Sequence, residues 1–429
     1  MLNGLKISFI GILSVVFFSC VHDDVDNYPQ TGNTWTFIAY LDGDNDLADD
    51  LLSDMAEMKA GALSADIRVL ALLDLPDGRT AKRYEIRQGV QTQLADIGEL
   101  DMAAPETLTD FLVWAKQQID QPTHTVLLLA DHGNGWDQLV GPSPPETPLS
   151  QKTAARSMFV DWDNGSRRAM MLNHMIREAI EAADLSIDIL ALDASIMGTI
   201  EAIYEFANLA PLIISSQEVG YRDGWDYEYI LKQLSKNTSI TREAFSSLVV
   251  DSYERYFEQV VYPSGIEADD QRFTIATHRS DLIQQIAAAV EQLSIRLTTE
   301  LNDETLQVDS MAKLSNARDS AEKIDRYIQP YVYVDLKDFV TKLGLTSEIP
   351  RLIDQATVAS YSGKDRPNAN GLSIVFYQFP NAYGLTYDSN YKNWDALSLT
   401  GNRGAFLNEF QWDEMLQVYY QAAFPELEL

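Results

Sequence analysis

The feature that most constrains the fold is a set of three short apolar segments that carry no charged residue. They are Thr125–Ala130, Ile189–Leu192 and Pro211–Ser216. Strands of this kind, without alternation of polar and apolar residues, are typical of the buried centre of a parallel sheet. Helical patterns separate the strand-like segments along the chain, as crossover connections do. The sequence therefore predicts an α/β fold around a mostly parallel sheet.

Further elements are predicted on both sides of these segments. Apolar residues recur at helical spacing from Leu47 to Met58, and Thr107 marks the expected start of another helix. Long helical patterns between Asp281 and Leu343 predict C-terminal helical additions. The other expected strands are Trp35–Leu41, Ile67–Leu73, Lys82–Arg87 (in a hairpin at the sheet edge), Arg272–Thr277 and Leu372–Tyr377.

The N-terminal segment has the pattern of a lipoprotein signal peptide. Lys6 precedes the almost wholly apolar run 7–18, which is too short to span a bilayer comfortably, and Ser19 then precedes Cys20, the only cysteine. We expect residues 1–19 to be removed and Cys20 to be lipidated. The acidic segment 20–33 would then be a tether. An ordinary cleaved signal is the alternative, because two bulky phenylalanines stand before Ser19.

These expectations place the mature chain outside the cytoplasm, anchored to a bacterial membrane by lipid. The acidic tether also resembles the export tag of lipoproteins on the surface of the outer membrane. The net charge argues against other anionic partners: 32 Lys and Arg against 64 Asp and Glu give −32. A chain this acidic repels phosphate backbones and lipid headgroups. We therefore expect no nucleic-acid binding and no membrane contact except through the lipid.

Candidate catalytic residues follow two of the three charge-free segments. Ligands bind at the carboxyl ends of parallel strands, so the residues after each strand are the first place to look. Asp131-His132-Gly133 follows the first segment and Asp193-Ala194-Ser195 follows the second. This pattern would aim an imidazole into a crevice, beside an unshielded backbone N–H, with a hydroxyl opposite. Ordinary turn chemistry is the alternative, since such short motifs are common.

Several segments, in order, resemble the clostripain family of cysteine peptidases. The resemblance implies a caspase-like three-layer α/β/α sandwich and cleavage of peptide or protein substrates after arginine or lysine. It covers residues 34–429, with a caspase-like core at about 34–280 and a C-terminal elaboration at about 281–429. The matching segments are Ile38–Leu47, Asp131–Trp136, Leu192–Tyr204, Ser216-Gln217-Glu218, Tyr333–Leu336 and Gly371–Phe376.

The resemblance assigns a role to each candidate residue. His132 takes the position of the catalytic histidine, and the N–H of Gly133 that of an oxyanion donor. Ser195 stands where the family has its nucleophilic cysteine. A thiol reaches the thiolate near a positive neighbour, whereas an alkoxide does not form at neutral pH. Asp193 and Asp223 resemble the acidic residues that line the pocket for the basic side chain, where carboxylates would select a guanidinium or an ammonium.

Metal sites receive little support from the sequence. Asp42-Gly43-Asp44-Asn45-Asp46 does not fit a calcium loop of the EF-hand type, because Ser53 occupies position twelve, where a bidentate glutamate is needed. Helix capping by residues 44–46 is the simpler interpretation. Calcium remains an option only through the family resemblance. The histidines 22, 124, 174 and 278 lack the paired spacing of zinc ligands, so no metal ligands are assigned.

Three functions stay open. The first is a lipid-anchored clostripain-like pseudoenzyme that keeps its pocket for Arg or Lys but has lost most or all proteolysis. The second is an active endopeptidase that uses Ser195 and His132, and the third is a non-enzymatic surface peptide-binding module. Family members often cleave themselves between the histidine and the nucleophile, an interval that here contains Lys152, Arg156, Arg167 and Arg168. If Ser195 is inert, we expect a single uncut chain.

Overall fold

The computed structural model describes most of the chain after residue 33. The described residues are 34–76, 78–119, 122–133, 135, 158–161, 169–220, 224–261, 271–324, 332–382, 385–386, 391 and 404–426. The predicted signal peptide, the tether and Cys20 lie outside them, as do Asp223 and the four basic residues of the expected processing interval. No helix in the described ranges is long and apolar enough to cross a membrane.

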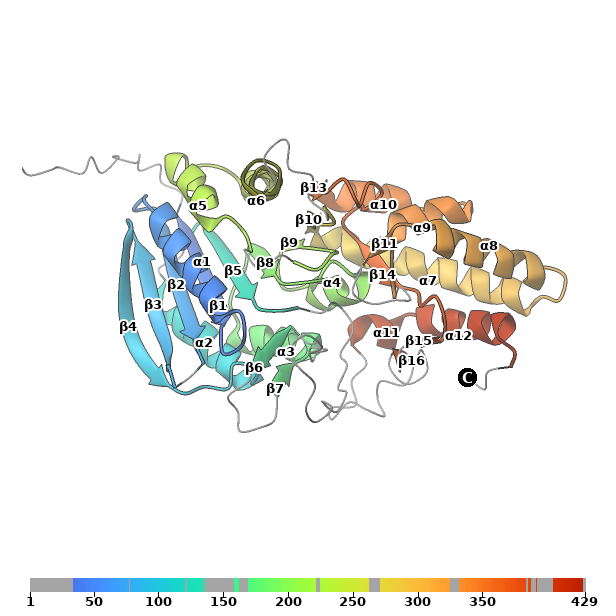
Figure 1. Ribbon diagram of the computed structural model, residues 1–429, viewed down its shortest axis with the longest axis horizontal. Coiled ribbons are helices and arrows are strands. Elements are labelled where there is room, and N and C mark those ends of the chain that lie inside the picture. The colour runs from blue at the N-terminus through green and yellow to red at the C-terminus, as the bar shows by residue number, and fades with distance from the viewer. Residues whose placement is uncertain are drawn as a thin grey trace, which may run out of the picture.

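A nine-stranded sheet forms the centre of the molecule, in the order β13-β10-β9-β8-β5-β1-β2-β3-β4 (Figure 1). Its five middle strands are parallel, and the two strands at each edge are antiparallel to their neighbours. The strands are β1 (Trp35–Asp42), β2 (Ile67–Asp74), β3 (Ala81–Arg87), β4 (Val90–Gly98), β5 (His124–Ala130), β8 (Ile189–Asp193), β9 (Leu212–Ser215), β10 (Thr274–Arg279) and β13 (Thr357–Ser362).

The three charge-free segments are the neighbouring strands β5, β8 and β9, which confirms the predicted sheet. Their side chains divide between two apolar clusters, one on each face of the sheet, because successive residues of a strand point to opposite sides. In β1, for example, Ile38 and Tyr40 join one cluster, and Phe37 and Ala39 join the other.

Helices cover both faces, as the predicted three-layer α/β/α fold requires. One face packs against α1 (Ala48–Gly61), α5 (Tyr227–Lys236) and α6 (Arg242–Arg255), which continues into a π-helix at Tyr256–Val261. The other face packs against α2 (Pro105–Gln118), α3 (Asn173–Ala183) and α4 (Ile200–Phe206). The helix expected to start at Thr107 begins instead at Pro105, since proline is well suited to the first turn of a helix. A small hairpin, β6 (Phe159–Asp161) with β7 (Ala169–Met171), lies between β5 and α3 in the chain.

The C-terminal part lies at the opposite end of the molecule from β4 (Figure 1). Its helices are α7 (Ser280–Asn302), α8 (Gln307–Ser320), α9 (Leu336–Leu343), α10 (Ile349–Ala356), α11 (Ala405–Glu409) and α12 (Trp412–Ala423). The expected strand at Leu372–Tyr377 is the shorter β14 (Ser373–Val375), which belongs to a second sheet with β11 (Lys323–Ile324) and β12 (Tyr333–Asp335). A two-stranded ribbon, β15 (Asn381–Ala382) with β16 (Leu385–Thr386), follows.

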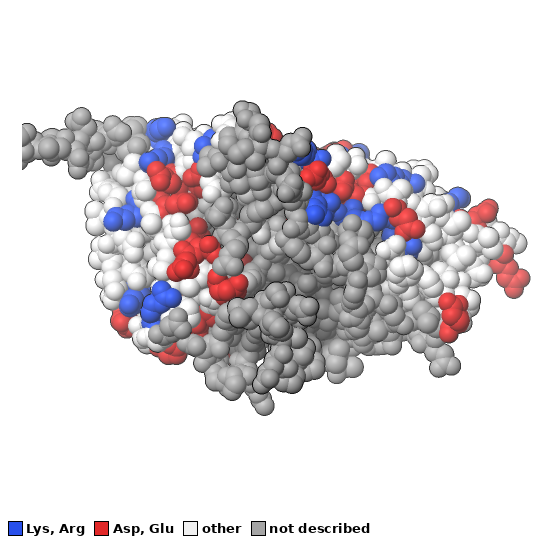
Figure 2. Space-filling view, in the orientation of Figure 1, with Lys and Arg blue, Asp and Glu red and all other residues white. Residues whose placement is uncertain are grey.

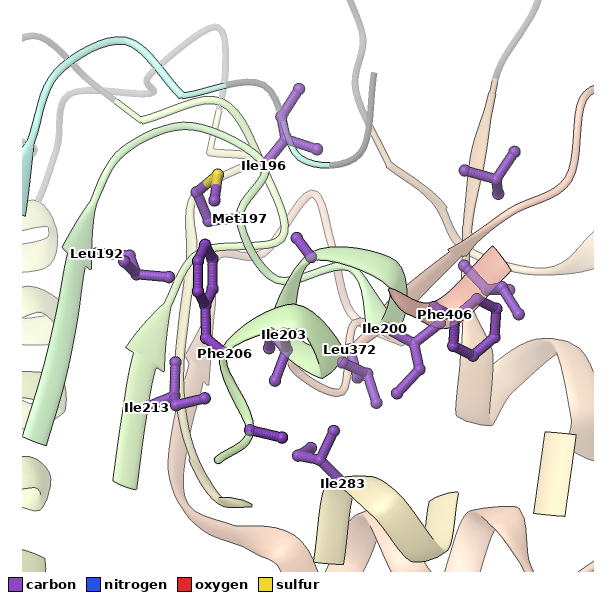
Figure 3. Packing of buried hydrophobic residues seen from close by; sticks show 14 of the residues in the cluster. Leu192, Ile196, Met197, Ile200, Ile203, Phe206, Ile213, Ile283, Leu372 and Phe406 are labelled. Carbon is purple, nitrogen blue, oxygen red and sulfur yellow. The ribbon is translucent and has the colours of Figure 1, made fainter. Parts of the chain in front are cut away.

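The C-terminal part shares one apolar cluster with the central sheet. Figure 3 shows Ile200 and Ile203 of α4 near Ile283 of α7, Leu372 before β14 and Phe406 of α11. In addition, β13 extends the main sheet beyond β10. The segment after residue 280 is therefore packed into the same core, and it also contributes side chains close to the candidate site.

Candidate functional site

A cleft of about 320 Å³ lies at the carboxyl ends of the parallel strands. It is the place where a sheet of this kind is expected to bind its ligand. The loop and helix after β1 line it from Asp46 to Asp54, the ends of β5 and β8 form its floor, and Ser216, Val219, Gly220, Gly224 and Trp225 complete the lining. Its polar lining includes Asp46, Asp50, Asp54, Asp131, His132, Asp193, Ser195 and Ser216.

The two predicted catalytic segments meet in this cleft. The N–H of Ser195 donates to the carbonyl of His132 at 2.8 Å, so the loops after β5 and β8 are in direct contact. Gly133 permits this approach: a Cβ atom on residue 133 would lie 2.4 Å from the Ser195 nitrogen. Its φ of +69° also falls in the left-handed region that glycine adopts without strain. The geometry explains why a glycine follows the histidine.

The side chains of Ser195 and His132 have different partners. The Ser195 Oγ accepts a hydrogen bond from the N–H of Gly220 at 2.9 Å, its sole side-chain hydrogen bond to the described residues. The His132 Nε2 lies 3.0 Å from Asp46 Oδ1, and both side chains are partly exposed to solvent. The sequence analysis gave Asp46 only a possible part in helix capping and no role in the site. No local pattern reveals it, because the contact depends on how the loop after β1 approaches the end of β5.

The backbone N–H groups that could stabilise an oxyanion are engaged in this structure. The Gly133 N–H donates to the Met158 carbonyl at 3.3 Å, and the Ser195 N–H donates to His132. The Gly133 bond is long for an N–H···O contact, so it is a weak one. The oxyanion role of Gly133 stays a prediction, and it requires the Met158 carbonyl to yield its place to a substrate.

Asp193 lies at the floor of the cleft, with Asp54 beside it. Its Oδ2 accepts a hydrogen bond of 2.6 Å from the Tyr227 hydroxyl, and burial raises the pKa of the Asp193 carboxyl to about 6. The two carboxylates converge on Gly224: a Cβ there would lie 3.1 Å from Asp193 Oδ2 and 3.8 Å from each carboxylate oxygen of Asp54. Asp54, on α1, was missed by the sequence analysis, and the predicted partner Asp223 lies outside the described residues.

The residue after Ser195 has an unusual backbone. Ile196 has a φ of +61°, a conformation that is a genuine outlier for a β-branched side chain. Such a residue costs roughly 1–3 kcal/mol and persists only where its surroundings hold it, often at functional sites. The N–H of Ile196 donates to the carbonyl of Glu218 at 3.1 Å. The strained residue therefore directly follows Ser195, which lines the cleft.

The segment Asp42–Asp46 has a structural role that the sequence analysis did not predict. The expected helix capping differs in detail: Leu47 is the residue before α1 and its side chain makes no capping bond, while Asn45 Oδ1 accepts the Leu47 N–H at 2.8 Å. The buried Asn45 also donates from Nδ2 to Asp131 Oδ1 at 2.9 Å and to the Asp42 carbonyl at 3.2 Å. In the described ranges, no three His, Cys, Asp or Glu side chains are placed to hold a metal ion.

Acidic side chains gather along α1 on the face of the molecule seen in Figure 2. Three acidic residues of α1 and the turn before it, Asp46, Asp50 and Asp54, line the cleft. They are four residues apart, so on α1 and the turn before it they lie along one face. Exposure to solvent falls along this row. The side chain of Asp46 is 45% exposed, whereas Asp54 as a whole residue is 5% exposed. The cleft is thus strongly anionic from its mouth to its floor.

Comparisons with known proteins agree with this fold. The model of the Clostripain family matches residues 39–419. Clostripain of Hathewaya histolytica is 22% identical over 415 residues, which cover 82% of this chain and 76% of the relative.

Two solved structures extend the comparison. A secreted C11 cysteine protease of Bacteroides thetaiotaomicron, bound to an irreversible peptide inhibitor, matches with a TM-score of 0.61 and 16% identity, over 85% of this chain and 98% of that one. An inactive zymogen C11 protease of Parabacteroides distasonis matches with a TM-score of 0.59 and 18% identity, over 82% and 94%. The solved proteases share the fold that places the cleft at the ends of β5 and β8. Because the family model matches most of its length, this chain belongs to the clostripain family of peptidases.

Proposed function

We propose that the chain is a clostripain-like peptidase homologue that recognises an arginine or lysine side chain in peptides and proteins. Its hydrolytic activity would be lost or strongly weakened, because Ser195 stands at the position of the nucleophilic cysteine. The mature protein would lie outside the cytoplasm, anchored through lipidated Cys20. The secreted C11 protease among its structural relatives is consistent with an extracytoplasmic location.

The observation that carries the proposal is the pair of carboxylates at the cleft floor. Asp193 and Asp54 both lie within 4 Å of one point beside Gly224, and both line the cleft. With a pKa of about 6, Asp193 is mostly ionised at neutral pH. Partly desolvated carboxylates bind guanidinium and ammonium groups through charge-assisted hydrogen bonds, so a basic side chain is the chemistry that fits.

Binding to this floor can be measured without any turnover. We expect a short peptide with one arginine to bind to the wild-type chain, and Asp193→Asn to weaken binding by about 30-fold or more, as loss of one partner of a buried charge pair does. Lysine in place of arginine should retain binding, and norleucine should abolish it. Asp188→Asn is the matched control, because Asp188 is also an aspartate next to β8 but lies before the strand, at the end away from the cleft. Equal affinity for the arginine and norleucine peptides would contradict the proposal.

The weak point of hydrolysis is the serine itself. To attack a peptide carbonyl, Ser195 Oγ must transfer its proton to His132 as the Oγ–C bond forms, and His132 must then protonate the leaving amine. Among the described residues the Oγ accepts a hydrogen bond from Gly220 and donates none to the His132 imidazole, so the contact that proton transfer needs is not formed. We therefore expect the serine form to cleave arginine and lysine peptides at least several hundred-fold more slowly than its Ser195→Cys variant.

A second candidate function, an active serine peptidase, is favoured by one observation. The 3.0 Å contact between Asp46 and His132 supplies the carboxylate that a serine–histidine pair needs in order to orient its base. If this candidate is right, the wild-type chain cleaves arginine peptides. Asp46→Asn then lowers kcat by about tenfold or more, with little change in KM. Asp50→Asn is the control, since Asp50 is the next acidic residue along the same face. Cleavage that survives Ser195→Ala belongs to a contaminant and excludes the candidate.

A further inference from the structure

The turn that carries Ser195 is held by one loop, residues 216–220. The N–H groups of Ile196 and Gly198 donate to carbonyl oxygens of this loop at 3.1 and 2.7 Å, and the N–H of Gly220 in the loop donates to the Ser195 Oγ at 2.9 Å. Three residues of the turn, Ser195, Ile196 and Gly198, are therefore hydrogen-bonded to the same five-residue loop. A displacement of the loop would move the hydroxyl and its hydrogen-bond donor together.

The turn needs this support because its backbone is strained at Ile196. With a φ of +61°, Ile196 occupies a region that β-branched residues avoid. Figure 3 shows Ile196 at the bend, while Met197 and Phe206 pack near Leu192 at the end of β8. Apolar packing holds the side chains of both Ile196 and Met197, and the hydrogen bond to the Glu218 carbonyl also holds the backbone of Ile196.

The loop is in turn anchored by an ion pair with the C-terminal part of the chain. Arg366 donates from Nη2 to both carboxylate oxygens of Glu218, at 3.0 and 3.3 Å, and both side chains are buried. Arg366 comes from the segment between β13 and β14, 148 residues further along the chain. Its Nη1 also lies 3.6 Å from Glu322, so two carboxylates fix the guanidinium.

We infer that Arg366 is a positioning residue for Ser195: its buried ion pair with Glu218 fixes the 216–220 loop, and the loop holds the strained turn and the N–H of Gly220 against the residue at position 195. The inference rests on the proposed role of this turn as the chemical end of the cleft. It assigns to the C-terminal part a function in the site, although none of its residues lines the cleft within the described ranges.

The test measures a thiol at position 195 and needs no peptide turnover. In the full chain carrying Ser195→Cys, iodoacetamide alkylation is followed by mass spectrometry that resolves position 195 from Cys20. The N–H of Gly220 would stabilise the thiolate, so its withdrawal leaves less thiolate at neutral pH. We expect Arg366→Met to slow alkylation by about tenfold and to move the pH of half-maximal rate upward. Arg366→Lys should give an intermediate effect, because an ammonium cannot reproduce the two-pronged contact.

Two controls separate positioning from a general loss of structure. Arg318 is also a buried arginine of the C-terminal part, but it pairs with Asp319 and Tyr419, away from the loop. Arg318→Met should lower the melting temperature and leave the alkylation rate unchanged. The second control removes the backbone strain at residue 196. Ile196→Gly should reduce the effect of Arg366→Met, because glycine adopts a positive φ without strain. Ile196→Ala loses the same packing but still strains the left-handed backbone, so it should not reduce the effect.

The outcomes are distinct. An unchanged alkylation rate and pH profile in folded Arg366→Met, or an equal effect of Arg318→Met, would overturn the inference. If Arg366→Met does not fold, Glu218→Gln replaces it: slower alkylation supports the inference and an unchanged rate refutes it. Failure of the proposed function would instead appear as no binding of arginine peptides by a chain whose alkylation still depends on Arg366.

Discussion

Individual residues of the site differ in how far the sequence could predict them. His132, Gly133 and Ser195 come shortly after the ends of charge-free strands, and the family resemblance assigned their roles; the structure brings all three together. Asp46 and Asp54 could not be assigned to the site, because aspartates next to a helix are common and only the path of the chain after β1 brings them into the cleft. The place of a site residue can be predicted when it lies next to a strand of the central sheet. It is harder to predict when the path of a loop determines it.

His278 is a buried group outside the cleft whose protonation should be visible in stability. Burial lowers the pKa of its imidazole from 6.5 to about 4, so the folded chain resists protonation while the unfolded chain accepts it. The unfolded state thus binds more protons between these values, and stability is full above pH 6.5 and falls as the pH falls toward 4. We expect His278 to account for a loss of about 2 kcal/mol between pH 7 and pH 5.

His278→Leu isolates this contribution. Its free energy of unfolding, measured by urea denaturation at pH 7 and pH 5, should fall by about 2 kcal/mol less than that of the wild-type chain. Burial raises the pKa values of Asp193 and Asp335 to about 6 and therefore acts in the opposite direction, but these groups are present in both proteins and cancel in the comparison. An equal pH dependence in the two proteins would show that the imidazole does not resist protonation.

At the scale of elements, the central strands could be predicted because they are uniformly buried and apolar. The outermost strands could not, because their exposed residues form no such pattern. β5, β8 and β9 carry no charge in their central residues because helices cover both faces. β4 is exposed along most of its length, so it has no apolar pattern to detect. β13 is also half-exposed, and it pairs with a strand from a distant part of the chain. Local patterns do not contain such long-range pairings.

The loop between β1 and α1 joins two elements through one side chain. Asn45 bonds the end of β1 and the carboxylate of Asp131 after β5, in a buried setting. Asn45→Ala removes a donor to a buried carboxylate, which should cost roughly 1.5–3 kcal/mol in unfolding free energy. Asn45→Asp should cost more, since it places a second negative charge against Asp131. Thermal and urea denaturation measure both, and a change below 0.5 kcal/mol, the size typical of a surface substitution, would contradict the linking role.

The same loop carries Asp46, so the two roles can be separated. Because Asn45 fixes the backbone next to Asp46, Asn45→Ala should also disturb the contact between Asp46 and His132. Asp46→Asn keeps the side-chain size and leaves Asn45 in place, so it should cost little stability, as a partly exposed ion pair does. A large loss of stability in Asp46→Asn would mean that this carboxylate is structural.

At the scale of the whole molecule, the family resemblance predicted the layered fold but not the relation between its two parts. The division near residue 280 would suggest a core that works by itself. Instead, β13 completes the main sheet, and Arg366 bonds the loop beside Ser195. The candidate site residues all lie before residue 280, and by our inference Arg366, after it, helps to hold the turn at Ser195 in place.

The state of the purified chain tests this organisation and the loss of activity together. If Ser195 is inert, the wild-type chain stays in one piece. Ser195→Cys should restore cleavage after Lys152, Arg156, Arg167 or Arg168, because the thiolate is the missing part and the carboxylates at the cleft floor remain. Fragment masses identify the bond. The double variant Ser195→Cys with His132→Ala is the control, and it should remain uncut.

Each other result has a definite meaning. Cleavage of the wild-type chain that Ser195→Ala abolishes would establish the serine as a working nucleophile, with Asp46 as the group that orients His132. Cleavage that persists in Ser195→Ala comes from another protease acting on an exposed segment. If Ser195→Cys stays intact but still binds arginine peptides, the chain has kept the binding pocket and lost the catalytic geometry. The engaged N–H of Gly133 would then be the first place to look for the obstruction, because it already donates to the Met158 carbonyl and the predicted oxyanion would need that donor.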